Sequence, residues 1–501
     1  MFKKVLIANR GEIAVRVIRT CREMGIRTVA VYSEVDRGAR HVELADEAVL
    51  IGAPPPGESY LNIERILNAA KESRAVAIHP GYGFLSENPK FSEAVSEAGL
   101  VFIGPPAQAM ALLGNKIESR ILAVKHGVPV TPGATFDVPD PKIVTQKAEE
   151  IGYPVLIKAA AGGGGKGMRV VHNRADLPMA LEAAQREAGS AFGDSTVYLE
   201  KYIPRPRHIE FQVFCDTHGN AVHLGERECS VQRRHQKIIE ESPSPVLTPE
   251  LRQRMGDAAV KVVKAAGYVN AGTVEFLFER GEFYFLEVNA RLQVEHPVTE
   301  LVTGEDLVEW QLRVAFGEPL PKTQEQIRSR GHAIECRIYA EDAARGFLPS
   351  SGTVLALEEP HIPGVRIDTG IREGSEISVY YDPILSKVIA FGDTRELAIR
   401  KMREALNQYM LLGVATAMEL LRDVLGHADF AAGNLSTHFL DEHFPNWQPS
   451  KPTETDLAAA LLAATKTTAR RAASSEDGKR GIPSPWVSLG PWQIAGGKGG
   501  A

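Results

Sequence analysis

The chain has 501 residues, of which 44% are hydrophobic and 24% charged, the composition of an ordinary globular protein. A chain of this length exceeds what one hydrophobic core usually holds, so about three domains are expected. The formal net charge of -6 argues against a protein that coats nucleic acid, and any anionic ligand must be met by a local cluster of cations.

The cysteines and the apolar stretches indicate the compartment. No C-x-x-C pair occurs among the cysteines, which are Cys21, Cys215, Cys229 and Cys336. No signal-like apolar run follows Met1, and the longest apolar stretch of the tail, residues 457–464, is too short to span a bilayer. We therefore expect buried thiols in a reducing cytoplasm, with neither a membrane nor a nucleic-acid partner.

The first part of the chain alternates strand-like and helix-like segments. Residues 4–8 read as a strand, and the apolar residues that follow have the spacing of a helix that ends at Gly25. Further strands are expected at 28–32, 48–51, 76–79 and 101–104, with helices at 61–71 and around Phe91 and Val95. This order predicts a doubly wound β/α domain over residues 1–114. Its first turn, residues 9–12, lacks G-x-G-x-x-G, which disfavours dinucleotide binding.

After Gly114 the pattern changes to longer helices and antiparallel strands, which predicts a second domain over residues 115–330. Its most distinctive segment is the glycine run at 162–165, which follows the apolar strand 155–158. The run is not a Walker A loop, because Gly167 stands where a Ser or Thr is required after Lys166. A phosphate cradle, a lid hinge and a plain flexible turn all remain open.

A hairpin in the same domain brings two acids together. Residues 273–278 and 283–287 read as strands joined by a short glycine-containing loop, which places Glu275 opposite Glu287. Facing like charges are destabilising unless a cation lies between them, so these acids and Asn289 form a predicted Mg²⁺ or Mn²⁺ site. The alternatives are a solvated acidic face, or a register slip that separates the acids.

Polar and apolar residues alternate from Tyr284 to Pro297. An extended chain would direct every second residue to one face, so the polar members would line a site: Glu287, Asn289, Arg291, Gln293 and Glu295. Leu286, Val288, Leu292 and Val294 would pack on the other face. The basic run 233–237 reads, by itself, as a solvated patch.

Four blocks give the chain a resemblance to the biotin carboxylase component of biotin-dependent carboxylases, in the ATP-grasp superfamily. The blocks are residues 7–14, 79–88, the glycine run, and 287–299. The resemblance covers Met1 to about Trp447. It implies an α/β fold of three parts: an N-terminal doubly wound β/α domain, a central ATP-grasp domain with a glycine-rich lid, and a C-terminal mixed α/β domain over residues 331–447.

The resemblance implies an ATP-dependent ligase that forms carboxyphosphate from ATP and bicarbonate and then transfers the carboxyl group to N1′ of biotin. The residues implied to bind ATP are Lys116, Lys158, Gly164, Gly165, Lys166, Glu200, Lys201, Ile203, His208, Gln232 and His235. Lys237, Arg291, Gln293 and the Val294 backbone would hold bicarbonate, with Glu295 as its base; Arg337 would stabilise the biotin enolate, and Tyr82 would lie beside biotin.

The resemblance also implies partners. Biotin would arrive on a separate biotin carboxyl carrier protein, because no Met-Lys-Met triplet occurs in the 501 residues. Carboxyltransferase subunits would take the carboxyl group onward. A homodimer is implied through Arg19, Glu23 and Arg366, although Pro363 departs from the aromatic residue often found in the family at that position.

Residues 448–501 are rich in Ala, Ser, Thr and Gly, which predicts a largely disordered tail. Trp486 and Trp492 interrupt it, and their segment faintly resembles the stretch that follows the carboxylase region in acyl-CoA carboxylases. We therefore expect an acyl-CoA acceptor, with acetyl-CoA and fatty acid biosynthesis as the specific case. The rival hypotheses are another ATP-grasp ligase that makes a carbamoyl or acyl phosphate, and an inactive assembly protein.

Overall fold

The computed structural model describes residues 1–136, 140–160, 167–451, 453–455, 457–458 and 461–462. Residues Met1–Pro449 form one compact unit and Ser450–Ala501 a second. Gly164, Gly165, Lys166 and the two tail tryptophans lie outside the described residues, as does most of the tail predicted to be disordered. No helix among the described residues is long and apolar enough to cross a membrane.

The N-terminal region is a parallel five-stranded sheet in the order β3-β2-β1-β4-β5. Its strands are β1 (Lys4–Ile7), β2 (Arg27–Ser33), β3 (Glu47–Gly52), β4 (Ala77–His79) and β5 (Val101–Phe102), and its helices are α1 (Gly11–Glu23), α2 (Arg40–Leu44), α3 (Ile63–Ser73), α4 (Pro89–Glu97) and α5 (Ala107–Gly114). Asn62 caps the N-terminus of α3, where its side chain accepts the backbone N–H of Arg65. Asn88 caps α4 in the same way and accepts the backbone N–H of Phe91. The predicted doubly wound domain is confirmed.

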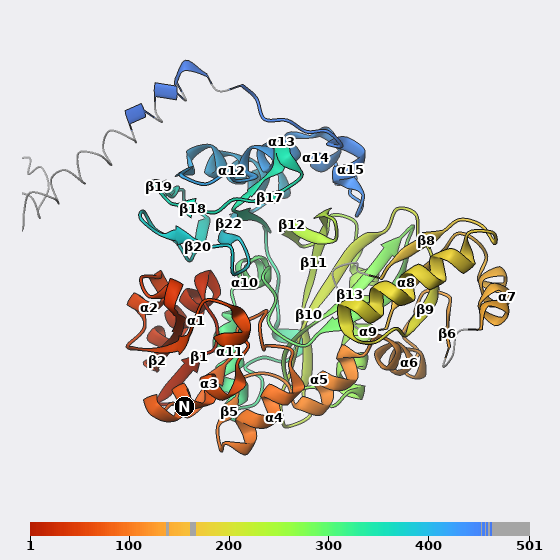
Figure 1. Ribbon diagram of the computed structural model, residues 1–501, viewed down its shortest axis with the longest axis horizontal. Helices are drawn as coiled ribbons and strands as arrows, with labels where there is room; N and C mark the ends of the chain where they lie inside the picture. The colour runs from red at the N-terminus through yellow and green to blue at the C-terminus, as the bar shows by residue number, and fades with distance from the viewer. Residues whose placement is uncertain (137–139, 161–166, 452, 456, 459–460, 463–501) are drawn as a thin grey trace, which may run out of the picture. The chain divides into compact units, whose positions relative to one another are not determined.

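A small antiparallel sheet follows in the order β6-β9-β7-β8. It consists of β6 (Gly133–Thr135), β7 (Val155–Ala159), β8 (Arg169–Val171) and β9 (Val197–Lys201), after helix α6 (Lys116–Lys125). Helices α7 (Pro141–Ile151) and α8 (Leu177–Phe192) pack against it and bury a separate apolar core (Figure 1). This sheet carries Lys158 and Glu200 on neighbouring strands.

A long antiparallel sheet forms the centre of the unit, in the order β14-β13-β10-β11-β12-β15-β22-β20. Its strands are β10 (Arg207–Cys215), β11 (Ala221–Arg233), β12 (Gln236–Ser242), β13 (Asn270–Glu279), β14 (Glu282–Asn289), β15 (His332–Tyr339), β20 (Val365–Thr369) and β22 (Ile384–Gly392). Helices α9 (Pro249–Ala265), α10 (His296–Thr303) and α11 (Leu307–Ala315) pack on it. A domain boundary is predicted at residue 330, between β12 and β15 in the sequence. Hydrogen bonds between these two strands nevertheless join them in one sheet.

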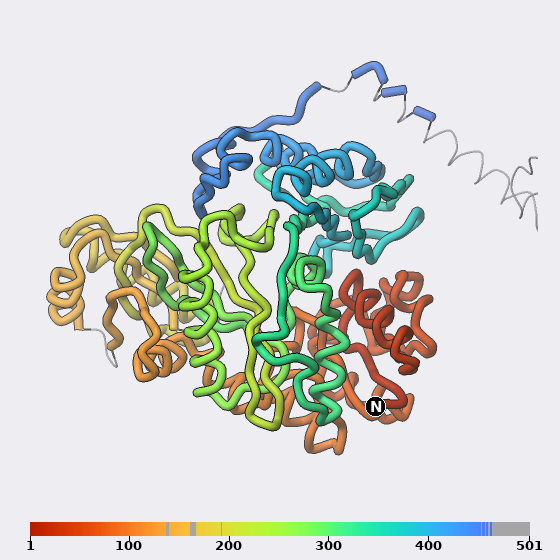
Figure 2. Tube along the Cα trace, turned by 180° about the vertical axis from the view of Figure 1, so that it is seen from behind, coloured from red at the N-terminus to blue at the C-terminus, as the bar shows by residue number. Residues whose placement is uncertain are grey.

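The C-terminal helices are α12 (Arg395–Gln408), α13 (Met418–Gly426), α14 (Ala428–Ala431) and α15 (Phe439–His443). Helix α12 packs on β15 and β22 over a second large apolar core, and the blue helices in Figure 2 gather on this side of the unit. Short strands complete the region: β16 (Glu341–Asp342), β17 (Leu348–Pro349), β18 (Gly352–Thr353), β19 (Ala356–Glu358), β21 (Glu376–Ile377) and β23 (Met410–Leu412). The three-part mixed α/β architecture is confirmed.

The predicted hairpin is β13 and β14, and Glu275 does lie opposite Glu287. Regular pairing from the turn would place Glu275 opposite Leu286, but the register shifts by one residue between Glu275 and Phe276. This bulge puts Leu286 and Glu287 on the same side, where both line one cavity. The facing acids therefore depend on a bulge that the sequence pattern did not reveal.

The prediction of one extended row from Glu287 to Glu295 was wrong beyond Asn289. Strand β14 ends at Asn289, the chain then turns, and Glu295 stands at the N-terminus of α10. Loop and helix geometry, rather than strand alternation, returns Arg291 and Gln293 to the cavity. The packing prediction failed for Leu286 and Val294, which line the cavity, and held for Val288 and Leu292, which are buried.

Candidate active site

One cavity of about 400 Å³ brings together most of the residues singled out from the sequence. Its predicted members are Lys116, Lys158, Glu200, Lys201, Ile203, His208, Gln232, His235, Lys237, Glu275, Glu287, Asn289, Arg291, Gln293, Val294 and Arg337. They come from the small sheet, the long sheet, the start of α6 and the loops that follow β9 and β11 and precede α10. Glu295 lies directly behind this lining and is fully buried.

Lys237 is the cation at which three buried carboxylates meet. Its Nζ lies 2.5 Å from Glu210 Oε2, 2.8 Å from Glu275 Oε1 and 2.8 Å from Glu295 Oε1. Burial alone would lower the pKa of Lys237, but the three carboxylates outweigh it and raise that pKa well above its ordinary value. Lys237 therefore stays charged and holds three acids from three different elements in one place.

Glu295 lies between two cations. Arg337 Nη2 donates to Glu295 Oε2 at 2.9 Å, while Lys237 occupies the other oxygen. Burial by itself raises the pKa of Glu295, yet Lys237 and Arg337 more than offset burial, and the pKa is lowered. The carboxylate is consequently ionised at neutral pH and able to accept a proton.

Arg337 also pairs with a second acid, Glu240, at 2.6 Å. Glu240 is fully buried, and burial, followed by the charge of Glu295, raises its pKa to about 7 despite the Arg337 guanidinium. Glu335 faces Glu240 across the β12–β15 ladder, and burial holds its pKa well above the ordinary value. The raised pKa values favour the neutral forms of Glu240 and Glu335, so these acids offset less of the Arg337 charge.

Glu210 and Arg227 belong to the site but were missed in the sequence. Arg227 is fully buried and donates to Glu210 at 2.6 Å and to Gln212 at 2.8 Å, which fixes Glu210 beneath Lys237. A signal was available, because strand alternation places His208, Glu210 and Gln212 on one face of β10. Three polar residues at that spacing in an apolar strand indicate a buried polar layer.

The end of the cavity whose residues were predicted to bind ATP carries cations with carboxylate partners. Lys158 Nζ lies 3.0 Å from Glu200, which Arg120 contacts at 2.8 Å, and Lys116 pairs with Glu287. Lys201 lines the same cavity, and its Nζ donates to the carbonyl oxygens of Gly152 and Tyr153. Apolar lining comes from residues that the sequence did not assign to the site: Leu156, Met168, Leu277 and Leu286.

The residues predicted to hold a metal fit that role in their chemistry. Glu275, Glu287 and Asn289 line the same cavity and supply the hard oxygen ligands that Mg²⁺ and Mn²⁺ prefer. Asn289 Nδ2 donates to Glu275 Oε1 at 2.8 Å, so a cation between them requires the amide to present its oxygen instead. Lys116 stands in for a cation at Glu287.

Arg291 is held in place from the N-terminal region. Its Nε donates to Glu87 Oε2 at 2.9 Å, its Nη1 to Gln293 at 2.6 Å, and Glu87 also accepts the Ala290 backbone N–H. The guanidinium thus lies at a fixed position beside Val294 and Glu295. This is the cationic corner predicted for bicarbonate.

A second cavity of about 430 Å³ adjoins the first and shares Gln236, Arg291, Val294 and Arg337 with it. Tyr82 lines only this second cavity, where Tyr381 and Phe84 supply further aromatic surface. Arg337 therefore faces the first cavity on one side and an aromatic pocket on the other. Two reactants bound in the two cavities would meet at the arginine.

Three family models together cover most of the chain. Residues 1–110 match the biotin carboxylase N-terminal domain, 115–323 the ATP-binding domain of the carbamoyl-phosphate synthase L chain, and 335–442 the biotin carboxylase C-terminal domain. The chain belongs to the biotin carboxylase family. It is an ATP-grasp ligase, and the two flanking matches disfavour the carbamoyl-phosphate alternative.

Relatives are similar over most of this chain. A pyruvate carboxylase component of Methanothermobacter thermautotrophicus is 54% identical over 88% of this chain and 90% of its own length. The methylcrotonoyl-CoA carboxylase α subunit of Dictyostelium discoideum is 49% identical over 98% of this chain and 70% of its own length. The match to the rat methylcrotonoyl-CoA carboxylase α subunit covers 63% of the length of that subunit. This chain therefore spans less than two thirds of the length of some relatives.

Among solved structures, the biotin carboxylase domain dimer of the Hydrogenobacter thermophilus 2-oxoglutarate carboxylase has a TM-score of 0.87 and 49% identity, covering 90% of this chain and 100% of its own. That structure contains MgADP, ADP and bicarbonate. The relatives are named for pyruvate, methylcrotonoyl-CoA and propionyl-CoA, so the expectation of acetyl-CoA and fatty acid biosynthesis is not supported.

The charge of His208 generates a pH prediction. Its Nε2 lies 3.2 Å from Glu275, and although burial lowers the pKa of His208, the Glu275 charge and the Glu210 contact raise it to about 9. The stabilisation is complete below the ordinary pKa of about 6.5 and is lost as the pH rises through 9.

We therefore expect His208→Gln, measured without metal or nucleotide, to lower the thermal midpoint by roughly 5 °C at pH 6 and by much less at pH 10. His126→Gln, an exposed histidine on the same region of chain, is the control. An equal loss at both pH values would show that the imidazole charge does not stabilise the site.

Proposed function

We propose that the chain carboxylates biotin with ATP and bicarbonate, through carboxyphosphate, on biotin carried by another protein. The observation that supports this most is Glu295, an ionised base held between Lys237 and Arg337 beside the Arg291 corner. The remainder of the proposal assigns each step to the groups around that carboxylate.

The first step activates bicarbonate. The anion would lie against Arg291 and Gln293, and Glu295 would take the proton of its O–H group. The freed oxygen attacks the γ-phosphorus, the bond from phosphorus to the ADP oxygen breaks, and carboxyphosphate and ADP form. Lys116, Lys158 and Lys237 neutralise the charge on the transferring phosphoryl group.

Mg²⁺ or Mn²⁺, held by Glu275, Glu287 and Asn289, would supply neutralisation of the phosphate charge when bound. The chain itself holds the side chains of these three residues at one wall of the cavity. Strand register and the β14 bulge do so for the two acids.

The second step transfers the carboxyl group. Carboxyphosphate breaks at its C–O bond into CO₂ and phosphate, the N1′ proton of biotin passes to that phosphate, and N1′ attacks CO₂. N1′ is a poor nucleophile until its ureido oxygen gains negative charge, which Arg337 would stabilise from the wall between the cavities. Tyr82 would pack against the bound biotin.

For the final acceptor we propose an acyl-CoA of the methylcrotonoyl or propionyl class, delivered through carboxyltransferase subunits. The support is the Dictyostelium α subunit, whose similarity covers 98% of this chain, whereas that of the archaeal pyruvate carboxylase component covers 88%. Carboxylation assays of the co-purified complex with methylcrotonoyl-CoA, propionyl-CoA and pyruvate test this choice. Activity with pyruvate alone would contradict it.

Glu295→Gln should retain ATP binding and lose bicarbonate-dependent ATP cleavage by about 100- to 10,000-fold, because an amide cannot accept the proton. Phosphate release with and without bicarbonate is the measurement, and fluorescent ATP-analogue titration checks binding. Glu97→Gln, on the exposed surface of α4, is the control. Near-normal bicarbonate-dependent turnover in the Glu295 variant would remove Glu295 from the base role.

Arg337→Ala should abolish carboxybiotin formation, while slow ATP hydrolysis without biotin is largely retained. Arg337→Lys keeps the charge but not the two-pronged donor, so it should fall between the alanine variant and the wild type. Carboxybiotin is measured as acid-labile ¹⁴C. Unchanged transfer in Arg337→Ala would place the enolate-stabilising group elsewhere.

We propose that biotin reaches the site on a carrier domain outside these 501 residues, which contain no Met-Lys-Met triplet. Incubation with a biotin protein ligase should leave the chain unbiotinylated on a streptavidin blot, while free biotin or a biotinylated carrier domain is carboxylated. A streptavidin signal on this polypeptide would overturn the assignment.

We also propose a homodimer, supported by the dimeric Hydrogenobacter domain. In this chain Arg366 is engaged internally with Glu300 and Asp368, whereas Arg19 is more exposed. Light scattering at micromolar concentration should give twice the 54.5 kDa chain mass. A monomer mass would refute the dimer.

A further inference from the structure

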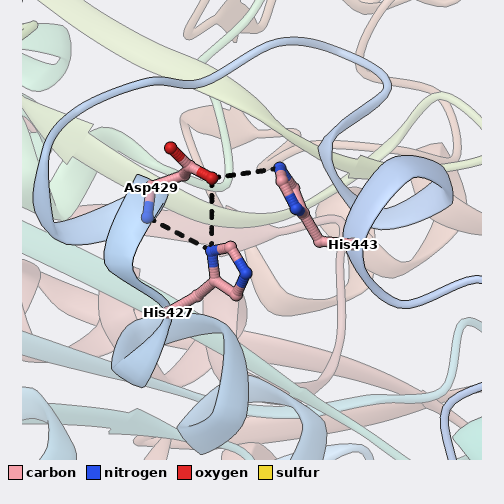
Figure 3. A group of neighbouring side chains, drawn as sticks. All are labelled: His427, Asp429 and His443. Atoms are coloured by element: carbon pink, nitrogen blue, oxygen red, sulfur yellow. Dashed lines mark hydrogen bonds and ion pairs between the residues drawn. The ribbon is translucent and has the colours of Figure 1, made fainter.

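Outside the two cavities, three side chains with metal-binding atoms converge near the C-terminal helices (Figure 3). His427 precedes α14, Asp429 lies in its first turn, and His443 is the last residue of α15. Asp429 Oδ2 is 3.9 Å from His427 Nδ1 and 3.7 Å from His443 Nε2. One nitrogen from each ring and one carboxylate oxygen thus all lie within 4.8 Å of one another.

The carboxylate oxygen points between the rings without hydrogen-bonding to either, because both distances exceed hydrogen-bond range. Its orientation is fixed from behind, where Asn434 Nδ2 donates to Asp429 Oδ1 at 3.1 Å. Such an outer contact is the arrangement that orients metal-binding carboxylates. A simple ion pair would be expected to close to a direct contact instead.

The two histidine rings lie close together. Their ring centroids are 4.3 Å apart, and both rings face the Asp429 carboxylate. His427 Nδ1 accepts the backbone N–H of Asp429 at 3.2 Å, so an ion at this nitrogen would replace that hydrogen bond. Imidazole nitrogens are the commonest metal ligands in proteins.

We propose that His427, Asp429 and His443 bind one divalent transition-metal ion, with Zn²⁺ as the best match to two imidazoles and one carboxylate. Bonds of about 2.0–2.1 Å in a tetrahedral site separate neighbouring donor atoms by about 3.3 Å. The observed separations of the carboxylate oxygen from the two nitrogens need to close by only a few tenths of an ångström. Water or another small donor would take the fourth position.

The site has a direct structural connection to the first cavity. Thr437 and His438, which line that cavity, lie in the segment between Asp429 and His443. The Thr437 backbone N–H donates to the Pro206 carbonyl at 2.9 Å, next to the start of β10. A bound ion would close this segment into a loop and hold that cavity wall in place.

Equilibrium dialysis of the metal-free full chain with Zn²⁺ alone tests the proposal. The variants are His427→Asn, which keeps a helix-capping acceptor for the Asp429 N–H, and His443→Asn. His361→Asn, an exposed histidine outside the cluster, is the control. We expect the wild type and the His361→Asn control each to bind one more Zn²⁺ ion per chain than either cluster variant. If a cluster variant keeps that ion, it should bind it at least tenfold more weakly.

Two further measurements guard against effects of misfolding. Asn434→Ala leaves all three donors in place and should weaken Zn²⁺ binding by about tenfold through loss of carboxylate orientation. Hydrogen exchange of residues 430–443 should slow on adding Zn²⁺ in the wild type and not in His443→Asn. Equal stoichiometry and affinity in wild type and cluster variants, or no bound Zn²⁺ in the wild type, would overturn the proposal.

Discussion

The site depends on burying several carboxylates around one ammonium group. Glu210, Glu275 and Glu295 are at most 4% exposed, and all three contact Lys237 Nζ. An unpaired buried carboxylate would protonate, so the acids keep their charge only because cations are buried beside them. The same constraint accounts for Arg227 beneath Glu210 and for Arg337 against Glu295.

The long antiparallel sheet satisfies this constraint. Glu210 and Glu275 are direct cross-strand partners on β10 and β13, Lys237 comes from β12, and Arg337 from β15. Strands β12 and β15 pair across the region between the central and C-terminal parts, so Arg337 is as firmly positioned as the central residues. Breaking one member of such a network leaves a buried charge without its partner, a large free-energy cost. The fold therefore positions Glu295, the proposed general base, and Arg337, the proposed enolate-stabilising cation, with the same set of hydrogen bonds.

Much of this could be predicted from the sequence, because the informative residues lie in local patterns. The Arg280-Gly281 turn, with both residues at positive φ, fixed the β13–β14 hairpin, and strand-helix alternation identified the parallel sheet. The bulge at Leu286 could not be predicted, since the register shifts between Glu275 and Phe276, away from the turn whose chemistry fixes the pairing. Glu210 and Arg227 were missed because their importance comes from each other, 17 residues apart in sequence, and from Lys237 on a third strand. The β12–β15 pairing likewise joins residues about a hundred positions apart, which no local pattern encodes.

The central claim is that bicarbonate activated at Glu295 attacks the γ-phosphorus before any carbon reaches biotin. The most direct test supplies [¹⁸O₃]bicarbonate, ATP, Mg²⁺ and biotin to the purified chain and determines the isotopic composition of the released phosphate by mass spectrometry. If carboxyphosphate forms, one oxygen of bicarbonate stays on phosphorus, so each turnover should yield phosphate with one ¹⁸O atom and carboxybiotin with two. Unlabelled phosphate released at the same rate as carboxybiotin would show that water attacks ATP, and would contradict the account.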